Sequence, residues 1–258
     1  QQNKVLKLPD NGIDKNRTGG IALGDGTFFG GIAEGEPLNR FYGYVATGII
    51  ETEEQAANAN YDALSRLPQK GAKRVGDYEW ADRNGDGQIT TADQFCLGVT
   101  VPPFTGGLQN SFRLKNWTLS LYLDWATGHS IFDESYSRYF YGTFTNNYAL
   151  AKDVLKAWKK PGDKTKYAKF YANDSNWGND NYNRSPTNTF TYKGDYLCLR
   201  EITLQYSLPS KLFTKVGLKG VTLTVSGNNL CYLTEVKGIS PETGASTTYE
   251  GSGDNAYY

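Results

Sequence analysis

The most informative stretch of the chain, residues 104–126, reads FTGGLQNSFRLKNWTLSLYLDWA. Apolar side chains stand at even positions in its first half and at odd positions in its second half, with polar or small residues between them. Alternation with a period of two predicts strands at 104–114 and 117–126, each with one apolar face. A two-residue turn at 115–116 pairs even with odd positions, so both apolar sets fall on the same face.

The second of these strands carries a row of apolar side chains with a tryptophan at each end: Trp117, Leu119, Leu121, Leu123 and Trp125. About eight residues at roughly 3.3 Å each span roughly 26 Å, or roughly 20 Å along a barrel axis at a tilt of about 40°. Strands of membrane barrels carry an apolar band of about 25 Å between two aromatic girdles. The row fits a lipid-facing strand, and it fits equally well the inner face of a soluble β-sandwich. We also expect Gly106, opposite Trp125, to leave bare backbone that the indole covers.

Two further alternating stretches predict strands at 196–208 and 221–230, with a bulge near Arg200 where the alternation changes phase. The strands are joined by a turn of two residues, a loop of about seventy and a connector of about a dozen, which is unusual in compact soluble domains. Outer-membrane barrels have this asymmetry of short turns and long loops. Four strands cannot close a barrel, which takes about eight.

The predicted fold class is therefore all-β: a segment of about four spanning strands from a larger antiparallel transmembrane β-barrel, with long extracellular loops that contain short helices. We expect residues 1–103 to form a long loop region and residues 104–258 to hold the barrel strands and their loops. A capping box at Thr52-Glu53-Glu54-Gln55 predicts a helix that continues to Leu64, and residues 147–158 predict a second helix.

The composition excludes several classes of function. Lys+Arg and Asp+Glu both number 27 in 258 residues, and this zero net charge argues against binding of nucleic acid. There is one histidine, His129, and no nucleophile motif beside it, so we expect no enzyme activity. Three widely spaced cysteines fit neither a metal thiolate site nor a disulfide framework. Aromatic residues make up 14% of the chain, which favours β-structure.

Residues 82–93, DRNGDGQITTAD, fit a twelve-residue calcium loop. Oxygen ligands are expected at positions 1, 3, 5, 7, 9 and 12, which are Asp82, Asn84, Asp86, Gln88, Thr90 and Asp93. A glycine at position 6 supplies the sharp turn, and a hard cation favours clustered oxygens of this kind. The loop thus predicts a structural calcium ion, and the alternative is an Asx-rich turn without metal.

An aromatic cluster in the long loop includes Tyr136, Tyr139, Phe140 and Tyr141. Such rings can stack on sugars or anchor a protein partner, so these four are candidates for contact with a ligand or partner. Packing of the rings within the loop itself is an equally good interpretation.

Several blocks of sequence resemble motifs of one family. Residues 76–89 are similar to the signature G-D-x-x-(Y/W)-x-D-x-N-G-D-G-x-I, residues 196–204 to F-L-R-L-K-N-(V/I)-T-L, and residues 225–242 to G-x-N-L…G-x-(D/S)-P-E. Residues 16–49 match the long loop that precedes the late strands of that family. With these blocks in order, the chain resembles the C-terminal part of a SusC/RagA-type TonB-dependent outer-membrane transporter of Bacteroidetes.

The resemblance implies a barrel of about 22 strands in the outer membrane that imports glycan or peptide fragments. It implies as partners a SusD-like surface lipoprotein, the remainder of the barrel and its plug, TonB and outer-membrane lipid. Polar side chains opposite the lipid face would line the lumen: Gln109, Tyr122, Asp124 and Gln205. The family's plug, TonB box and final strand are not found in the sequence, so we expect a fragment of a larger protein. The alternative is a secreted, calcium-stabilised, carbohydrate-binding β-sandwich.

Overall fold

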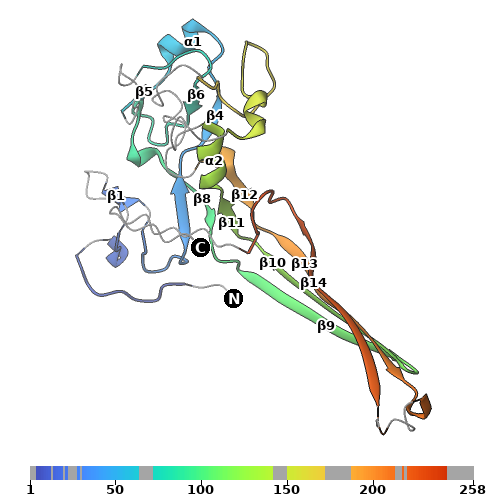
Figure 1. The fold of residues 1–258 in the computed structure, drawn as a ribbon. Coiled ribbons are helices and arrows are strands. Elements are labelled where there is room, and N and C mark those ends of the chain that lie inside the picture. Colours follow the sequence, from blue (N-terminus) through green and yellow to red (C-terminus); the bar gives the residue numbers. More distant parts are fainter. Residues whose placement is uncertain are drawn as a thin grey trace. The chain divides into compact units, whose positions relative to one another are not determined.

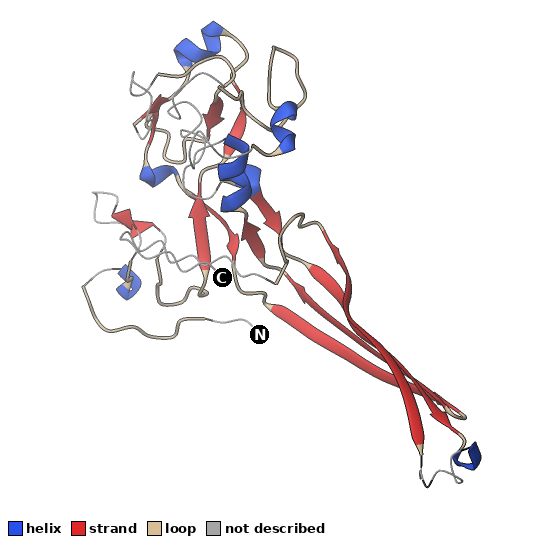
Figure 2. Cartoon of the chain, in the orientation of Figure 1, coloured by secondary structure: helices blue, strands red, loops and turns tan. Residues whose placement is uncertain are grey.

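A computed structural model describes residues 4–12, 14–19, 21–22, 28–29, 31–63, 72–141, 150–171, 187–212, 217 and 220–242. The chain divides into two compact units. The first, which we call the sheet unit, contains Pro102–His129 and Lys193–Thr243; the second, the loop unit, contains Gln2–Val101 and Ser130–Tyr192. The sheet unit consists of long strands, whereas the loop unit consists of short strands and helices (Figures 1 and 2).

The sheet unit is one four-stranded antiparallel sheet in the order β14-β13-β10-β9. Its strands are β9 (Phe104–Leu114), β10 (Trp117–Thr127), β13 (Tyr196–Leu208) and β14 (Val221–Thr234), and η5 (Ser210–Leu212) follows β13. All four predicted strands are present, and β14 continues four residues beyond its predicted end at residue 230. The predicted all-β, antiparallel fold class is confirmed.

The register of the first hairpin is the one that the alternation predicts. Leu114 pairs with Trp117, and Gly106 pairs with Trp125. Lys115, in the two-residue turn, has a positive φ of 52°. A methyl group on Gly106 would collide with the Trp125 indole, so the ring does lie over the bare backbone.

The predicted bulge in the third strand is also present. The pairing of β13 with β10 shifts between Leu199 and Glu201, where β13 has one residue more than β10. The register against β14 shifts at the same place, but there two residues of β14, Asn229 and Leu230, stand opposite one of β13. Arg200 is the extra residue. Because of it, Leu199 and Ile202 both stand on the same face of the sheet, although three positions separate them.

The loop unit is built from short paired strands. These are β1 (Ile21–Ala22) with β2 (Phe28–Phe29), β3 (Arg40–Gly43) with β8 (Phe95–Val99), β4 (Ala46–Ile49) with β6 (Tyr78–Trp80), β5 (Tyr61–Asp62) with β7 (Gln88–Ile89), and β11 (Ser130–Phe132) with β12 (Thr191–Lys193). Its helices are α1 (Glu53–Asn58) and α2 (Glu134–Tyr141), and its 3-10 turns are η1 (Asp14–Asn16), η2 (Thr91–Asp93), η3 (Lys152–Lys156) and η4 (Asn188–Phe190). Among the described residues, no helix has the length and apolar character needed to cross a membrane.

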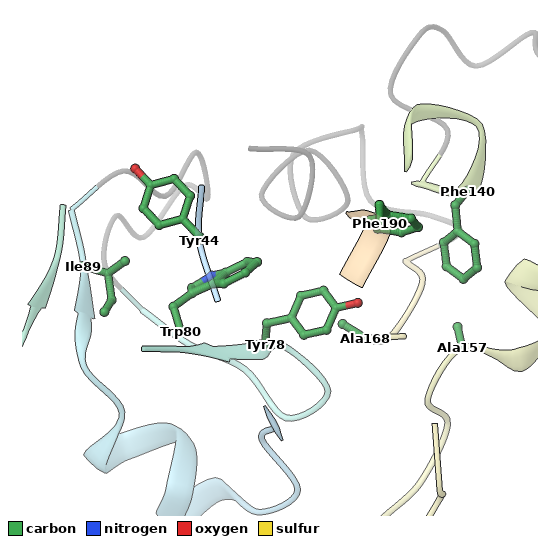
Figure 3. Packing of buried hydrophobic residues seen from close by; sticks show 8 residues of the cluster. All are labelled: Tyr44, Tyr78, Trp80, Ile89, Phe140, Ala157, Ala168 and Phe190. Atoms are coloured by element: carbon green, nitrogen blue, oxygen red, sulfur yellow. The ribbon is translucent and has the colours of Figure 1, made fainter. Parts of the chain in front are cut away.

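Aromatic side chains form the core of the loop unit (Figure 3). The buried cluster comprises Tyr44, Tyr78, Trp80, Ile89, Phe140, Ala157, Ala168 and Phe190. The ring centroids of Phe140 and Phe190 are 5.9 Å apart at an interplanar angle of 60°, and those of Tyr78 and Trp80 are 5.2 Å apart. Such edge-to-face and tilted ring pairs are favoured over face-to-face sandwiches.

Both predicted helices are shorter than expected. The capping box at Thr52 is confirmed, because its hydroxyl accepts from the Gln55 backbone N–H and the Gln55 side chain accepts from the Thr52 N–H. The helix nevertheless ends at Asn58, and Tyr61 then enters β5, which pairs with β7. Within 147–158 the described residues form only the 3-10 turn η3, and residues 147–149 lie outside the described part.

Candidate functional site

The five-residue row predicted to meet lipid lies on one face of β10. Its two tryptophans are exposed, Trp117 by 47% and Trp125 by 37%. The residues directly opposite on β9 and β13 are also apolar, except at Asn110 and Gly106. The Trp117 ring packs on Tyr206 of β13 at a centroid distance of 4.4 Å. The row is therefore the centre of a wider surface.

This surface extends over all four strands, and we call it the apolar face. Its members are Leu108, Phe112, Leu114, Trp117, Leu119, Leu121, Leu123, Trp125, Leu197, Leu199, Ile202, Leu204, Tyr206, Leu223, Val225, Cys231 and Leu233. On β14, Val225 is 73% exposed and Leu233 is 68% exposed. Cys231 and Leu233 lie beyond the strand end predicted at residue 230, so the alternation does not assign them to this face. A contiguous exposed apolar surface of this kind is characteristic of an interaction with membrane or protein.

The opposite side of the sheet, which we call the polar face, carries hydroxyl, amide and charged groups. The four residues predicted to line a lumen all stand on it: Gln109, Tyr122, Asp124 and Gln205. Ser111 of β9 and Ser120 of β10 face each other there, with their hydroxyl oxygens 3.2 Å apart. Two chemically opposite faces are what a barrel strand between lipid and a water-filled lumen requires.

Arg200 is the centre of a charged cluster on the polar face. Its Nε and Nη2 donate to the two carboxylate oxygens of Asp124 at 2.8 and 2.6 Å. Nη2 also donates to Glu242 Oε1 at 2.6 Å, and Nη1 donates to Asn229 Oδ1 at 2.9 Å. The hydroxyl of Tyr232 donates to the same Glu242 oxygen at 2.7 Å. The change of phase in the alternation predicts the bulge near Arg200, but no sequence pattern predicts this cluster.

The calcium-type loop is folded around its own side chains. The Asp82 carboxylate accepts from the backbone N–H groups of Gly85 and Gly87 at 2.7 and 2.8 Å, and Asp86 accepts from the Gln88 N–H at 2.8 Å. The pKa of Asp82 is lowered below its usual value, mainly because its carboxylate accepts the hydrogen bond from the Gly87 N–H. Gly87 has a positive φ of 78°, as the sharp turn requires.

Asp93, predicted as the last ligand of that loop, is buried. Its carboxylate accepts from the N–H groups of Arg83 and Thr90 at 3.0 and 2.7 Å, and it closes a capping box at η2. The three predicted acidic ligands do not converge. Within the described part of the chain, no group of three or more acidic, histidine or cysteine side chains is placed to hold a metal.

The aromatic candidates for ligand contact require one correction. Phe140 is fully buried in the core of the loop unit, so it stabilises the fold and is not available to a ligand. Tyr136 is half-buried, and its hydroxyl donates to Asp153 at 2.6 Å. Burial, with this hydrogen bond, raises the pKa of Tyr136 far above its usual value. The side chains of Tyr139 and Tyr141 lie outside the described part of the structure.

A sheet with one continuous apolar face and one polar face is the wall pattern of a membrane β-barrel. Two proteins of Formosa agariphila are similar in sequence. TonB-dependent receptor P3 is 29% identical over 93% of this chain, and TonB-dependent receptor P39 is 29% identical over 94%. The chain spans only 22% and 25% of their lengths. No family model matches the chain.

Two solved structures are similar to this chain in fold. The RagAB peptide importer in its open-open state matches 92% of this chain and 22% of its own, at 20% identity and a TM-score of 0.58. The structure of the RagAB peptide transporter matches 81% of this chain at a TM-score of 0.54. The resemblance predicted from the motifs is confirmed: over most of its length the chain resembles part of a TonB-dependent receptor and shares the fold of part of RagAB.

Proposed function

We propose that the chain forms part of the wall of a TonB-dependent importer in the outer membrane. The observation that supports this most strongly is the apolar face, which extends over all four strands and is backed by a polar face. In water, so large an apolar surface is costly to expose. Against lipid tails it is the stable arrangement, and the two inner strands, β10 and β13, already have hydrogen-bonded partners on both sides, as a membrane-spanning strand requires.

The two outer strands of the sheet support a larger barrel. Within the described residues, β9 and β14 each pair on one side only, so their outer edges are open to further strands. In a barrel these edges are closed by neighbouring strands of the same wall. The other sheets of the described residues have two strands each, so none is a second layer of similar size, as a β-sandwich needs.

The cargo and partners in this proposal rest on the resemblance. The importer takes up glycan or peptide fragments together with a SusD-like lipoprotein, and TonB drives movement of a plug that other parts of the protein supply. No covalent chemistry is involved. Gln109, Tyr122, Asp124 and Gln205 line the lumen, and the long loops contribute to the extracellular vestibule and the lipoprotein contact.

Fractionation of cells that express the full gene product tests the proposal. We expect the protein to be found in the outer-membrane fraction and to resist extraction with carbonate. Its solubilisation should require detergent, and it should co-purify with a lipidated chain of different sequence. Recovery from the aqueous fraction as a stable monomer would instead support the secreted carbohydrate-binding module and overturn the importer.

We also propose that the loop at 82–93 binds a structural calcium ion. Asp82, Asn84 and Asp86 lie on one exposed turn, so their oxygens are accessible to a hydrated cation. The strand that follows, β7, pairs with β5, and its Ile89 is fully buried in the core. Calcium at this turn therefore stabilises a loop that is tied to the core at its far end.

Trypsin cleavage after Arg83, within this loop, measures the effect of calcium. We expect calcium to slow this cleavage several-fold relative to a chelator in the wild type, and to have no effect in the double variant Asp82→Ala, Asp86→Ala. Asp163→Ala is the matched control, because Asp163 also accepts backbone N–H groups in an exposed turn but lies in another loop. Cleavage of the wild type at equal rates with calcium and with chelator rules out this site.

A further inference from the structure

The segment that follows β14 turns back over the sheet unit. We call residues 236–242 the strap. Val236, at its start, is 6% exposed, and Gly238 has a positive φ of 85° where the strap changes direction. At its end the strap is held to the rest of the sheet unit by hydrogen bonds from two different strand regions.

The first anchor is Pro241. Its backbone carbonyl lies 3.3 Å from Nε2 of His129, a buried residue just after β10. The His129 ring also packs edge-on against Tyr196 of β13, with centroids 6.5 Å apart and an interplanar angle of 86°. The imidazole is thus fixed in place, and it presents one nitrogen to the strap.

The second anchor is Glu242, which joins the charged cluster on the polar face. One of its carboxylate oxygens accepts from both Arg200 and Tyr232, at 2.6 and 2.7 Å. The hydrogen bond from Arg200 lowers the pKa of Glu242 most, and the hydrogen bond from Tyr232 lowers it further. The carboxylate is therefore charged at neutral pH, and charge-assisted hydrogen bonds of this kind are about twice as strong as neutral ones.

Arg200 can hold the strap because its guanidinium is already oriented. Asp124 binds the Nε and Nη2 edge through two nearly parallel hydrogen bonds, which fixes the plane of the group. Glu242 then shares Nη2, and Asn229 takes Nη1. Lysine has no planar fork, so it cannot satisfy these partners in the same geometry.

We propose that Arg200 is a latch that holds the strap closed against the polar face of the sheet, and that loss of the Glu242 contact releases the strap. The bulge in β13 places Arg200 for this role, since Arg200 is the residue that β13 has in excess of β10 there. The latch joins two of the sequence blocks noted above, at 196–204 and at 225–242, which are far apart in the chain. It relies on contacts within the sheet unit and does not depend on import.

Trypsin cleavage after Lys237, an exposed residue inside the strap, tests the latch in the full gene product in detergent. We expect Glu242→Gln to accelerate this cleavage by about tenfold or more, which corresponds to about 1.4 kcal/mol of lost closure. Glu235→Gln is the matched control, because Glu235 is an exposed residue beside the strap and the substitution changes the charge equally. We expect it to be cleaved at the wild-type rate.

Two further measurements separate release of the strap from general unfolding. Cleavage after Arg83 in the loop unit should keep its wild-type rate in Glu242→Gln. Arg200→Lys, which keeps the positive charge, should accelerate cleavage after Lys237 as Glu242→Gln does. Equal cleavage after Lys237 in Glu242→Gln and Glu235→Gln overturns the proposal, as does acceleration at Lys237 and Arg83 together.

Discussion

Replacing Leu121 by arginine tests whether the apolar face meets lipid. Leu121 is the midpoint of the row between Trp117 and Trp125, and it stands opposite Asn110 and Ile202 on the neighbouring strands. Arginine on the lipid face costs about 2–4 kcal/mol at the bilayer midplane and about 0–1 kcal/mol near the interfaces. At about 1.4 kcal/mol per factor of ten, the midplane cost lowers the folding equilibrium constant roughly 30-fold to 700-fold.

Two other arginine variants provide the comparison. Ser120 adjoins Leu121 in sequence but stands on the polar face, where an arginine should change the free energy of unfolding by less than about 0.5 kcal/mol. Leu114 stands on the apolar face at the end of its strand, so its arginine variant should lose only about 0–1 kcal/mol. Guanidinium unfolding of the full gene product in lipid vesicles measures all three. The reasoning fails if Leu121→Arg costs no more stability than Ser120→Arg, or if Leu114→Arg costs as much as Leu121→Arg. In a bilayer the free-energy cost of an arginine on the lipid face decreases from the midplane to the interface, so the position of the substitution along the strand must matter.

Three further predictions use other features of the two units. Gly106→Ala drives a methyl group into the Trp125 indole, so the same titration should show a loss of about 1–3 kcal/mol, and an unchanged midpoint would contradict that packing. Cys231 is exposed on the apolar face and Cys96 is exposed in the loop unit, so a water-soluble maleimide should modify only Cys96 in intact outer membranes; equal labelling by mass spectrometry argues against lipid at Cys231. Burial raises the pKa of Glu79 above its usual value of 4.5, so its contribution to stability is present at low pH and is lost as the pH rises through the raised pKa. Glu79→Gln should therefore gain stability over the wild type as the pH rises from about 4 to about 7, and a pH-independent difference would refute this.

The sheet unit could be predicted closely from the sequence, because its residues obey one local rule. Alternation with a period of two assigns every side chain to a face, and a slip of one residue reverses all of them, so the pattern determines the register. Leu114 opposite Trp117 and the bulge at Arg200 both follow from that rule. The strand end at Thr234 was missed, because the motif ending at Leu230 has the glycine and asparagines of a turn although the chain continues as a strand.

The loop unit could not be predicted in the same way, because its structure depends on contacts between distant residues. The side chain of Asn188 accepts from the Ala46 N–H at 2.9 Å, across 142 positions of sequence. Phe140 lies in a stretch with several other aromatic residues, and only the packing of Phe190 and Tyr167 around it reveals that it is core. The capping box at Thr52 shows where α1 begins, but a pairing with β7 determines where it ends.

The bulge at Arg200 keeps the apolar side chains of β13 on one face although their alternation changes phase, and it adds a charged residue to the opposite face. Before it, Leu197 and Leu199 occupy odd positions, and after it Ile202 and Leu204 occupy even positions, yet all four stand on the apolar face. In a regular strand one of these pairs would point to the polar face, where apolar groups would meet water or the lumen. The extra residue corrects the phase, and the side chain it adds is itself charged and joins the polar face. A single inserted residue thus keeps the apolar side chains of β13 on one face and supplies the guanidinium for the latch, so deletion of Arg200 should damage both faces, whereas Arg200→Lys should damage only the latch.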